Sequence, residues 1–546
     1  MVDRLLGKHH TGESRTGKTP TRPPRSGKPV VAEPTARHAQ RGVDVSERLP
    51  AIASDGFPVS QVSVGRVARW IAALCVVVSS AGCILTQDIP VPALDIPQAY
   101  KVDKAGKLTG QDAPPPLDWW RGFGSPELTA LMEEAQKVNH DIAAAVARFR
   151  EADAQARIAG AALLPTLAAS GPGNLFQESY SRVSGSSLNG LSTGGREVVN
   201  YNSALSASYM LDFWGQYHDA AQAAEETSAA NRFDRDVTAL TTLTAVAAAY
   251  FQVLASQDRI KTANSNVASA QRILDAIKER FKAGTGTDLD VAQQESVLAN
   301  QRAAIPTLRQ TLDQNVNALA LLLARPPESL KVAGGSMNQL AIPRVTPGLP
   351  SELLTQRPDI KRQEAQLASA TANVGSARAQ FFPNIQLTGG GGYQSSGLVS
   401  LIQPHAAFFN MVASINQPIF DGGAILGNFE LTKAQQEEML QTYRKTVISA
   451  LTDVDNALVA VRDTTDKLRL QRQVVTASRR AFQLSEQQLK AGTADIVTVL
   501  NTQLTLFQAE DALWQAQLAR LLAIVSLYQA LGGGWEPKME NQANAL

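Results

Sequence analysis

An internal repeat constrains the fold of this chain more than any other feature of its sequence. The recurring landmarks, copy one first, are Asp141 and Asp359, Pro165 and Pro383, Asp212 and Asp421, and Gly284 and Gly492. Within each copy the aspartate precedes the proline by the same number of residues. The order of these landmarks predicts the same elements along each copy. They are a helix, a proline, a polar and Gly-rich segment, an Asp-aromatic/Gly turn, a very long helix, a Gly-Thr turn and a further helix.

The two very long helices are predicted from about 215 to 282 and from about 423 to 490, where no proline interrupts the chain. At 1.5 Å per residue each is roughly 100 Å long. A coiled-coil seam is predicted in both copies. Its residues are Val267, Ala270, Leu274, Ile277 and Phe281 in copy one and, with more polar side chains, Val475, Ser478, Phe482, Ser485 and Leu489 in copy two.

Between the helices, residues 201–211 and 409–419 alternate in the manner of β-strands. Segments 166–180 and 385–393 precede them, which predicts four strands in two hairpins. Each strand has about the ten residues that a tilted membrane strand requires. Four strands cannot close a barrel, and an open edge in lipid leaves backbone groups unpaired. Either this sheet packs as a soluble one, or several chains complete one barrel.

The N-terminal region has the composition of an export signal. Residues 1–63 are rich in Pro, Arg and Gly, which predicts disorder or a mis-assigned translation start. Residues 64–82 form a basic and then apolar signal peptide that ends before Cys83. Cys83 is therefore the predicted lipidation site and the mature N-terminus, although Ser80 stands where a bacterial lipobox usually has leucine. The alternative is an ordinary signal peptide with an incidental cysteine. Ile84 favours the outer membrane over inner-membrane retention.

Composition and motifs exclude several classes of function. The net charge is only +1, and acidic residues slightly outnumber basic ones after residue 82, which argues against nucleic-acid binding. The two cysteines, Cys75 and Cys83, lie in or beside the signal, and no Cys/His cluster has metal-ligand spacing. We find no nucleotide-binding loop and no persuasive catalytic constellation, so no cofactor, metal or enzymatic activity is predicted.

Five segments in this order resemble the TolC-like outer membrane efflux family, in particular its lipidated OprM/NodT-like branch, over about residues 117–535. They are WWRGFGSPELTALMEEA (119–135), RPDIKRQEAQLASA (357–370), ARAQFFPNIQLTG (377–389), QPIFDGG (417–423) and LKAGTADIVTVLNTQ (489–503). The resemblance implies a homotrimer whose three chains build a 12-stranded membrane β-barrel, a long α-helical barrel across the periplasm, and an equatorial belt. The fold class is thus mainly α with membrane β.

The resemblance also implies the function. The chain would be the outer-membrane exit duct of a tripartite efflux system, passively conducting small molecules from the periplasm to the exterior. Its partners would be outer-membrane lipid, a periplasmic adaptor (membrane fusion) protein and an inner-membrane RND-type transporter that supplies the energy. Two other functions stay open from the residues themselves: a lipid-anchored periplasmic coiled-coil scaffold and, with less support, an envelope enzyme.

The domain boundaries follow from the repeat. After the signal we expect an N-terminal linker (83–116), efflux repeat 1 (117–334), an equatorial inter-repeat linker (335–350), efflux repeat 2 (351–535) and a C-terminal tail (536–546).

Candidate functional residues lie at and just beyond the Gly-Thr turns. By the resemblance, Gly284, Thr285, Gly492 and Thr493 form periplasmic tip turns that dock the adaptor. Asp288, Asp290, Asp495, Thr498 and Asn501 are the candidate gate at the periplasmic entrance, with Thr498 and Asn501 where relatives often carry Asp. The alternative for Asp288 and Asp495 is N-capping and first-turn charge. Trp214, at a predicted strand–helix junction, is a candidate membrane-interface anchor.

Overall fold

The structure is a computed structural model that describes residues 90, 96–97, 100, 116–171, 173–177, 197–345, 348–533 and 535. The chain divides into two units, Met1–Ala72 and Ala73–Leu546, and all described residues lie in the second. The predictions for 1–63, 64–82, Cys83, most of the linker 83–116 and the tail 536–546 fall outside the described residues.

The described residues are mainly helical, which confirms the predicted class at that level. The helices are α2 (Pro126–Val138), α3 (His140–Ala161), α4 (Gln216–Lys282), α5 (Asp288–Leu322), α6 (Leu353–Gln356), α7 (Pro358–Ala379), α8 (Ala424–Lys490) and α9 (Ile496–Ala530). The strands are β1 (Thr166–Ser170), β2 (Gly173–Gln177), β3 (Glu197–Leu211), β4 (Asn384–Ser395) and β5 (Ala407–Asn416). Short 3-10 helices are η2 (Trp119–Phe123), η4 (Pro327–Ser329), η5 (Met337–Gln339), η6 (Pro350–Glu352), η7 (Leu398–Ser400) and η8 (Pro404–Ala406).

The repeat is visible in the lengths of equivalent helices. α3 and α7 each have 22 residues, α4 and α8 each have 67, and α5 and α9 each have 35. The predicted ends of both long helices are confirmed to within one residue.

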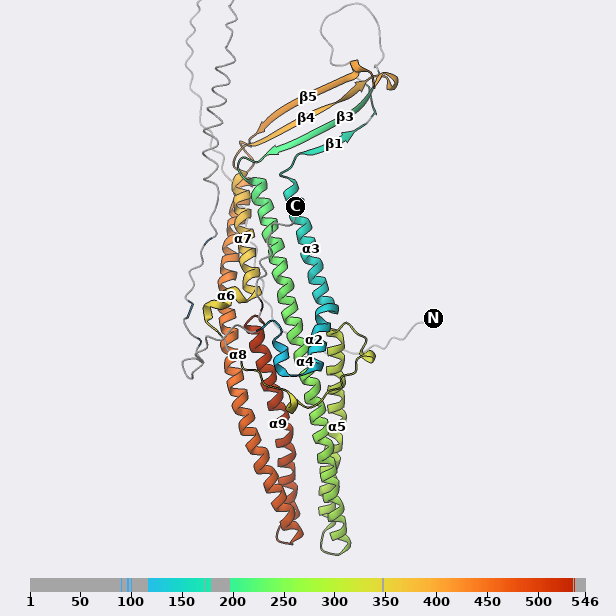
Figure 1. Ribbon diagram of the computed structural model, residues 1–546, viewed down its shortest axis with the longest axis vertical. Helices are drawn as coiled ribbons and strands as arrows, with labels where there is room; N and C mark the ends of the chain where they lie inside the picture. The colour runs from blue at the N-terminus through green and yellow to red at the C-terminus, as the bar shows by residue number, and fades with distance from the viewer. Residues whose placement is uncertain are drawn as a thin grey trace, which may run out of the picture. The chain divides into compact units, whose positions relative to one another are not determined.

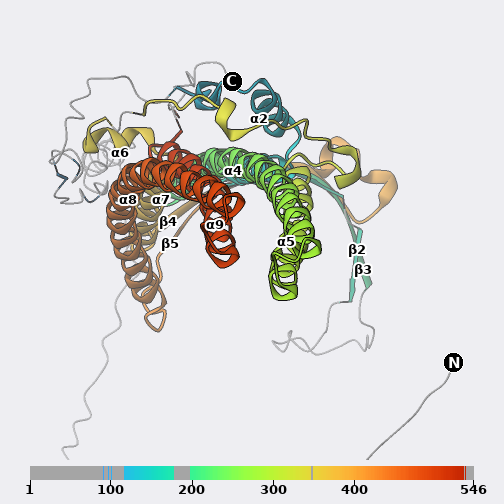
Figure 2. The same cartoon turned by 90° about the horizontal axis from the view of Figure 1, so that it is seen from below.

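Figure 1 shows the sheet at one end of α3, α4, α7 and α8, while the far ends of α4 and α8 form hairpins with α5 and α9. Seen from below, α5 and α9 stand on one side of the layer formed by α8, α7 and α4, and α2 and α6 lie on the other (Figure 2). The sheet and the two hairpin tips therefore occupy opposite ends of the same long helices.

The largest apolar core lies where α4, α5 and α9 meet α2 and η2. Trp119 stacks on Tyr528 with ring centroids 4.8 Å apart, and Phe123 contacts Phe251. One described helix, α4, is apolar and long enough to cross a membrane, but 56% of its most apolar window is buried within the protein. Core packing accounts for the apolar character of that window.

The two hairpins meet chiefly where α4 packs on α9. They share one apolar cluster, to which the first seam contributes Ala270, Leu274 and Ile277 and the second contributes Phe482 and Leu489. All five residues of the second seam are buried, and Ser485 is satisfied there by hydrogen bonds with the Phe482 carbonyl and the Thr502 hydroxyl. In the first seam the prediction for Phe281 is wrong, because its side chain is 45% exposed. α4 ends one residue later, so no further turn of helix covers that ring.

The sheet is antiparallel with the order β1-β3-β4-β5, and β2 also pairs with β3. The structure therefore has five strand segments, because the first predicted strand (166–180) is divided. The register continues across the division, with Ser170 opposite Ala204 and Gly173 opposite Tyr201. The sequence at the division is Gly171-Pro172, and proline has no amide hydrogen to donate to a ladder.

Candidate functional site

The sheet has one apolar and one polar face. Cross-strand pairs such as Tyr209 with Leu387 and Gly389 with Met411 fix which residues share a face. The apolar face carries Leu167, Ala169, Leu205, Ala207, Tyr209, Leu211, Ile385, Leu387, Phe409, Met411, Ala413 and Ile415. The opposite face carries Thr166, Ser170, Ser206, Ser208, Gln386, Thr388, Asn410 and Ser414, with Ala168, Ala204, Met210, Phe408 and Val412 as apolar exceptions.

Nothing in the described part of the chain covers the apolar face. Phe409 is 91% exposed and Met411 is 81% exposed. On the polar face, by contrast, side chains contact one another, since the Gln386 amide donates to the Ser208 hydroxyl at 3.0 Å. A sheet with one apolar face and one polar face is typical of membrane barrels, in which apolar side chains face the lipid and polar side chains face the lumen. β5 ends at Asn416, so Gln417 and Ile419, predicted to extend this face, lie beyond the strand.

The centre of β4 consists of four glycines, and the close approach of β3 requires at least one of them. A Cβ atom added at Gly392 would collide with the backbone of Ser203 and Ala204. A side chain there would therefore push β3 away from β4 and break the ladder in the middle of the sheet.

The junctions between sheet and long helices are fixed by the two predicted aspartates. The Asp212 carboxylate accepts from the amides of Tyr217 and His218, at 3.0 and 2.7 Å. Asp421 accepts from the amide of Ile425 at 2.7 Å. These bonds satisfy amides in the first turns of α4 and α8, as a helix N-terminus requires. The N-cap residues themselves are Gly215 and Gly423, so each aspartate caps its helix from just outside the first turn.

Trp214 packs at the first of these junctions. Its ring stacks on Phe382 with centroids 4.7 Å apart, and its indole N–H donates to the Pro383 carbonyl at 2.9 Å. The tryptophan thus joins the end of β3 to the start of β4, which connects repeat 1 to repeat 2. Its use as a membrane-interface anchor stays a prediction.

The tip turns have the same geometry in both repeats. Gly284 and Gly492 have positive φ, 77° and 70°, a conformation that favours glycine. The amides of Thr285 and Thr493 reach back to the carbonyls of Arg280 and Gln488, each at 2.9 Å. This pattern is a Schellman motif, which ends a helix and reverses the chain.

Beyond the first tip, the candidate gate residues take part in helix capping. Thr287 is the N-cap of α5, and its hydroxyl accepts from the Asp290 amide while the Asp290 carboxylate accepts from the Thr287 amide. This reciprocal pair is a capping box. Asp288 is the first residue of the helix and contributes first-turn charge. The Thr287-to-Asp290 spacing was the signal in the sequence for this arrangement, and sequence reasoning missed Thr287.

Beyond the second tip, Asp495 is the N-cap of α9 and accepts from the Thr498 amide at 2.9 Å. Hydrogen bonds from the side chain and the amide of Thr498 lower the pKa of Asp495. Asn501 is exposed one turn further along α9. Asp290 and Thr498 are each the third residue of their helix, α5 and α9, and are therefore equivalent in the two repeats. Repeat 1 has a carboxylate at this position, and repeat 2 has a hydroxyl.

The segment between the repeats is tied to α4. The Asp258 carboxylate is buried and accepts from the Met337 amide at 2.9 Å and from the Ser336 hydroxyl at 3.2 Å, which anchors η5. Burial raises the pKa of Asp258.

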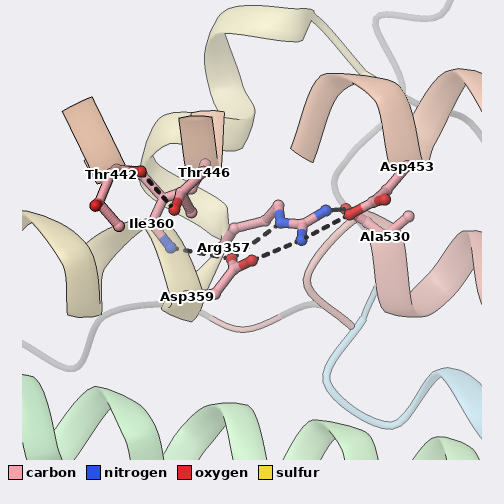
Figure 3. Close-up of polar contacts among 7 residues, drawn as sticks. All are labelled: Arg357, Asp359, Ile360, Thr442, Thr446, Asp453 and Ala530. Carbon is pink, nitrogen blue, oxygen red and sulfur yellow. Dashed lines mark hydrogen bonds and ion pairs between the residues drawn. The ribbon is translucent and has the colours of Figure 1, made fainter. Parts of the chain in front are cut away.

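An arginine clamp joins three helices of repeat 2 (Figure 3). Arg357, at the N-terminus of α7, binds both carboxylate oxygens of Asp359, at 3.0 and 2.7 Å. The same guanidinium donates to the Ala530 carbonyl at the end of α9, at 2.9 Å, and to Asp453 on α8, at 3.3 Å. Burial alone would raise the pKa of Asp359, but the hydrogen bonds and charge of Arg357 outweigh it and the pKa is lowered.

Comparisons with known proteins agree with this geometry. The sequence profile of the outer membrane efflux protein family matches residues 131–325 and 349–533. OpmQ of Pseudomonas aeruginosa, a pyoverdine export outer membrane protein, is 39% identical over 455 residues, or 82% of this chain and 94% of that protein. CusC of Escherichia coli, a cation efflux system protein, is 29% identical over 465 residues, or 85% of this chain and 98% of that protein.

The solved structures lead to the same family. The crystal structure of the open state of the Neisseria gonorrhoeae MtrE outer membrane channel matches with a TM-score of 0.73 and 29% identity, covering 83% of this chain and 98% of that one. The family and these relatives are efflux channels of the outer membrane, not enzymes. The chain described here belongs to the outer membrane efflux protein family and is an outer membrane efflux channel.

Proposed function

We propose that three copies of this chain form the exit duct of a tripartite efflux system, which conducts small molecules passively from the periplasm to the exterior. The observation that carries the proposal is the amphipathic sheet. Among the described residues, its outer strands, β1 with β2 on one side and β5 on the other, each have one unpaired edge. Unpaired edges cost several kcal/mol per backbone group in lipid. Pairing β5 of one copy with β1 and β2 of the next removes every edge and gives a closed barrel.

The long helices support assembly as well. α8 carries an exposed apolar stripe, Ile448, Val459, Leu470 and Leu484, which are 38% to 59% exposed. Their spacing places them on one side of the helix. A periplasmic wall built from neighbouring copies would cover this stripe.

The remaining partners are proposed from the family. A periplasmic adaptor docks at Gly284, Thr285, Gly492 and Thr493, and an inner-membrane RND-type transporter supplies energy. The names of the two relatives point to different exported molecules, pyoverdine and cations, so we propose a general duct for small molecules and leave cargo selection to the pump.

The trimer is tested by crosslinking in detergent and by conductance in planar bilayers. We expect crosslinked species to stop at three subunits and the same preparation to form pores. A periplasmic coiled-coil scaffold would give trimers without conductance, and a monodisperse monomer that keeps its β signal in lipid would rule out the barrel.

We propose that Cys83 is the acylated N-terminus of the mature protein, since the apolar signal ends there. We expect mass spectrometry of the protein purified from the envelope to show no peptide from residues 1–82 and a lipid-modified Cys83. Recovery of peptides from residues 1–60 in the mature protein would contradict this assignment.

We propose that Asp290 and Asn501 face the periplasmic entrance near the axis of the trimer. Three Asp290 carboxylates around a narrow pore attract cations, so Asp290→Ala should weaken block by divalent ions and raise conductance. Asn501→Asp should strengthen that block, because it adds a second ring of carboxylates. Single-channel recording with and without divalent ions measures both effects. Thr287→Ala is the matched control, because it also breaks the capping box but keeps the Asp290 carboxylate. If the carboxylate itself attracts the ions, this variant should keep the block by divalent ions.

A further inference from the structure

Two glutamines interrupt the apolar contact between the hairpins, Gln294 on α5 and Gln503 on α9. Both occupy the 3-4 spacing that otherwise carries residues of the shared apolar cluster. Their neighbours in that spacing are Val291, Leu298, Val499 and Leu506. Both glutamine side chains are 0% exposed. Each therefore stands at a core position of its helix, where an apolar side chain would ordinarily pack.

The two side-chain amides are only half satisfied. Gln294 Nε2 donates to the Ala270 carbonyl at 2.8 Å and to Gln503 Oε1 at 3.3 Å. The Ala270 carbonyl fixes the orientation of the Gln294 amide, because a flipped amide would set two oxygens against each other. Gln294 Oε1 and Gln503 Nε2 are then left without a hydrogen-bond partner among the described residues. Burial of two such atoms weakens the contact that contains them.

Farther from the tips, the hairpins are joined by stronger contacts. There the Arg259 guanidinium binds both carboxylate oxygens of Asp511, at 2.6 and 3.1 Å. One turn along α9, the Trp514 indole N–H donates to the Thr262 hydroxyl at 2.8 Å. Both contacts hold α9 to α4, whereas the amide pair makes the sole hydrogen bond between α5 and α9 within the described ranges. The hairpins are therefore held firmly above the glutamines and weakly at them.

We propose that Gln294 and Gln503 are the release point of the periplasmic entrance, the contact at which the two hairpins of one chain part when the duct opens. This inference rests on the proposed duct. Parting the hairpins brings water to all four polar atoms of the amide pair, including the two that lack a partner. An apolar pair of the same shape would gain no hydrogen bond and would lose its burial. Nearer the tips, the half-buried Arg280 guanidinium donates to the Leu489 carbonyl at 3.1 Å, where water can take its place.

Replacement of both glutamines by methionine tests the release point, because methionine has a similar length and carries no amide. Gln294→Met with Gln503→Met should assemble as the wild type does, since exchanging both partners for apolar groups of the same shape is nearly neutral or stabilising. Heat dissociation of the trimer should occur at the same temperature or a higher one. The fraction of time that single channels spend open in planar bilayers should fall by about tenfold or more.

Gln503→Glu should have the opposite effect on the same measurement. Its carboxylate would still accept from Gln294 Nε2, but it would bury a charge among the apolar residues of the cluster. Such burial is costly, so the parted hairpins become favoured and the open fraction should rise by about tenfold or more. Loss of packing alone would shift both variants in one direction, and the release point shifts them in opposite directions.

Gln310→Met with Gln508→Met is the matched control, because it changes two exposed glutamines of the same helices and should leave the open fraction unaltered. An unaltered open fraction in the methionine pair or in Gln503→Glu, in trimers that assemble normally, would overturn the release point and leave the duct standing. Wild-type trimers without pores would overturn the duct instead. If neither variant assembles, hydrogen exchange of wild-type trimers decides. Amides of α9 around Gln503 should exchange faster than those around Trp514, and equal protection would overturn the proposal.

Discussion

Met411→Lys is expected to abolish assembly of the channel in the outer membrane. Met411 lies in the middle of β5 on the apolar face and is 81% exposed in the single chain. A lysine on the lipid face near the bilayer midplane costs about 2–4 kcal/mol. Three copies in one barrel triple that cost, which is comparable to the whole stability of an ordinary domain. The measurement is the fraction of heat-dissociable trimer recovered in the outer-membrane fraction.

Asn410→Lys is the matched control, because residue 410 is adjacent in β5 and points to the other face. Its lysine would enter the polar lumen of the barrel, so trimers should form in normal amounts. Equal loss of trimer in both variants would contradict the assignment of the two faces.

Arg357→Ala is expected to lower the stability of the chain by about 3–5 kcal/mol, the usual cost of removing one partner from a buried ion pair. The side chain of Arg357 is 11% exposed. Its loss removes the guanidinium from the Ala530 carbonyl and from Asp359, to which the Ile360 amide would still donate. The ends of α7 and α9 should then separate. Thermal unfolding followed by helical circular dichroism measures the change.

Arg462→Ala is the control for this variant. Arg462 pairs with Asp463 on the same helix, and both side chains are more than half exposed. Solvent screens such a pair, so unfolding should change little. A similar loss of stability in both variants would mean that the clamp contributes no more than a surface pair.

The clamp also predicts a dependence on pH. Because the folded protein lowers the pKa of Asp359 from its ordinary 3.8, this carboxylate stabilises the fold above that pH. The contribution is lost as pH falls through the lowered value. The difference in stability between wild type and Arg357→Ala should therefore be constant near neutral pH and shrink below about pH 3.8.

The sequence predicted the features that depend on local pattern. The ends of α4 and α8 and the alternation in β3 and β5 follow from residues close together in the chain. The capping box at the start of α5 has a local signal as well, the spacing from Thr287 to Asp290, which the reading of Asp290 as a gate residue leaves out.

Other features depend on partners that are distant in sequence. The segment that begins at Arg357 carries part of the family resemblance, but the contact with the Ala530 carbonyl joins residues far apart in the chain and has no local signal. Phe281 continued the heptad spacing, yet the helix ends beside it and the ring stays exposed. Periodicity predicts which side chains point inward, and only tertiary packing determines where the covering surface stops.

The equal lengths of α3 and α7, α4 and α8, and α5 and α9 have a consequence for how such a chain can change. Deleting one residue from α4 alone would shorten it by about 1.5 Å and turn everything beyond the deletion by about 100°. The tips at Gly284 and Gly492 would then stand at different heights, with their seams facing different directions. Insertions and deletions in these helices are therefore tolerable only when both repeats acquire them together. The connection 396–406 between β4 and β5 carries no such restriction, and variation in length among related channels should concentrate there.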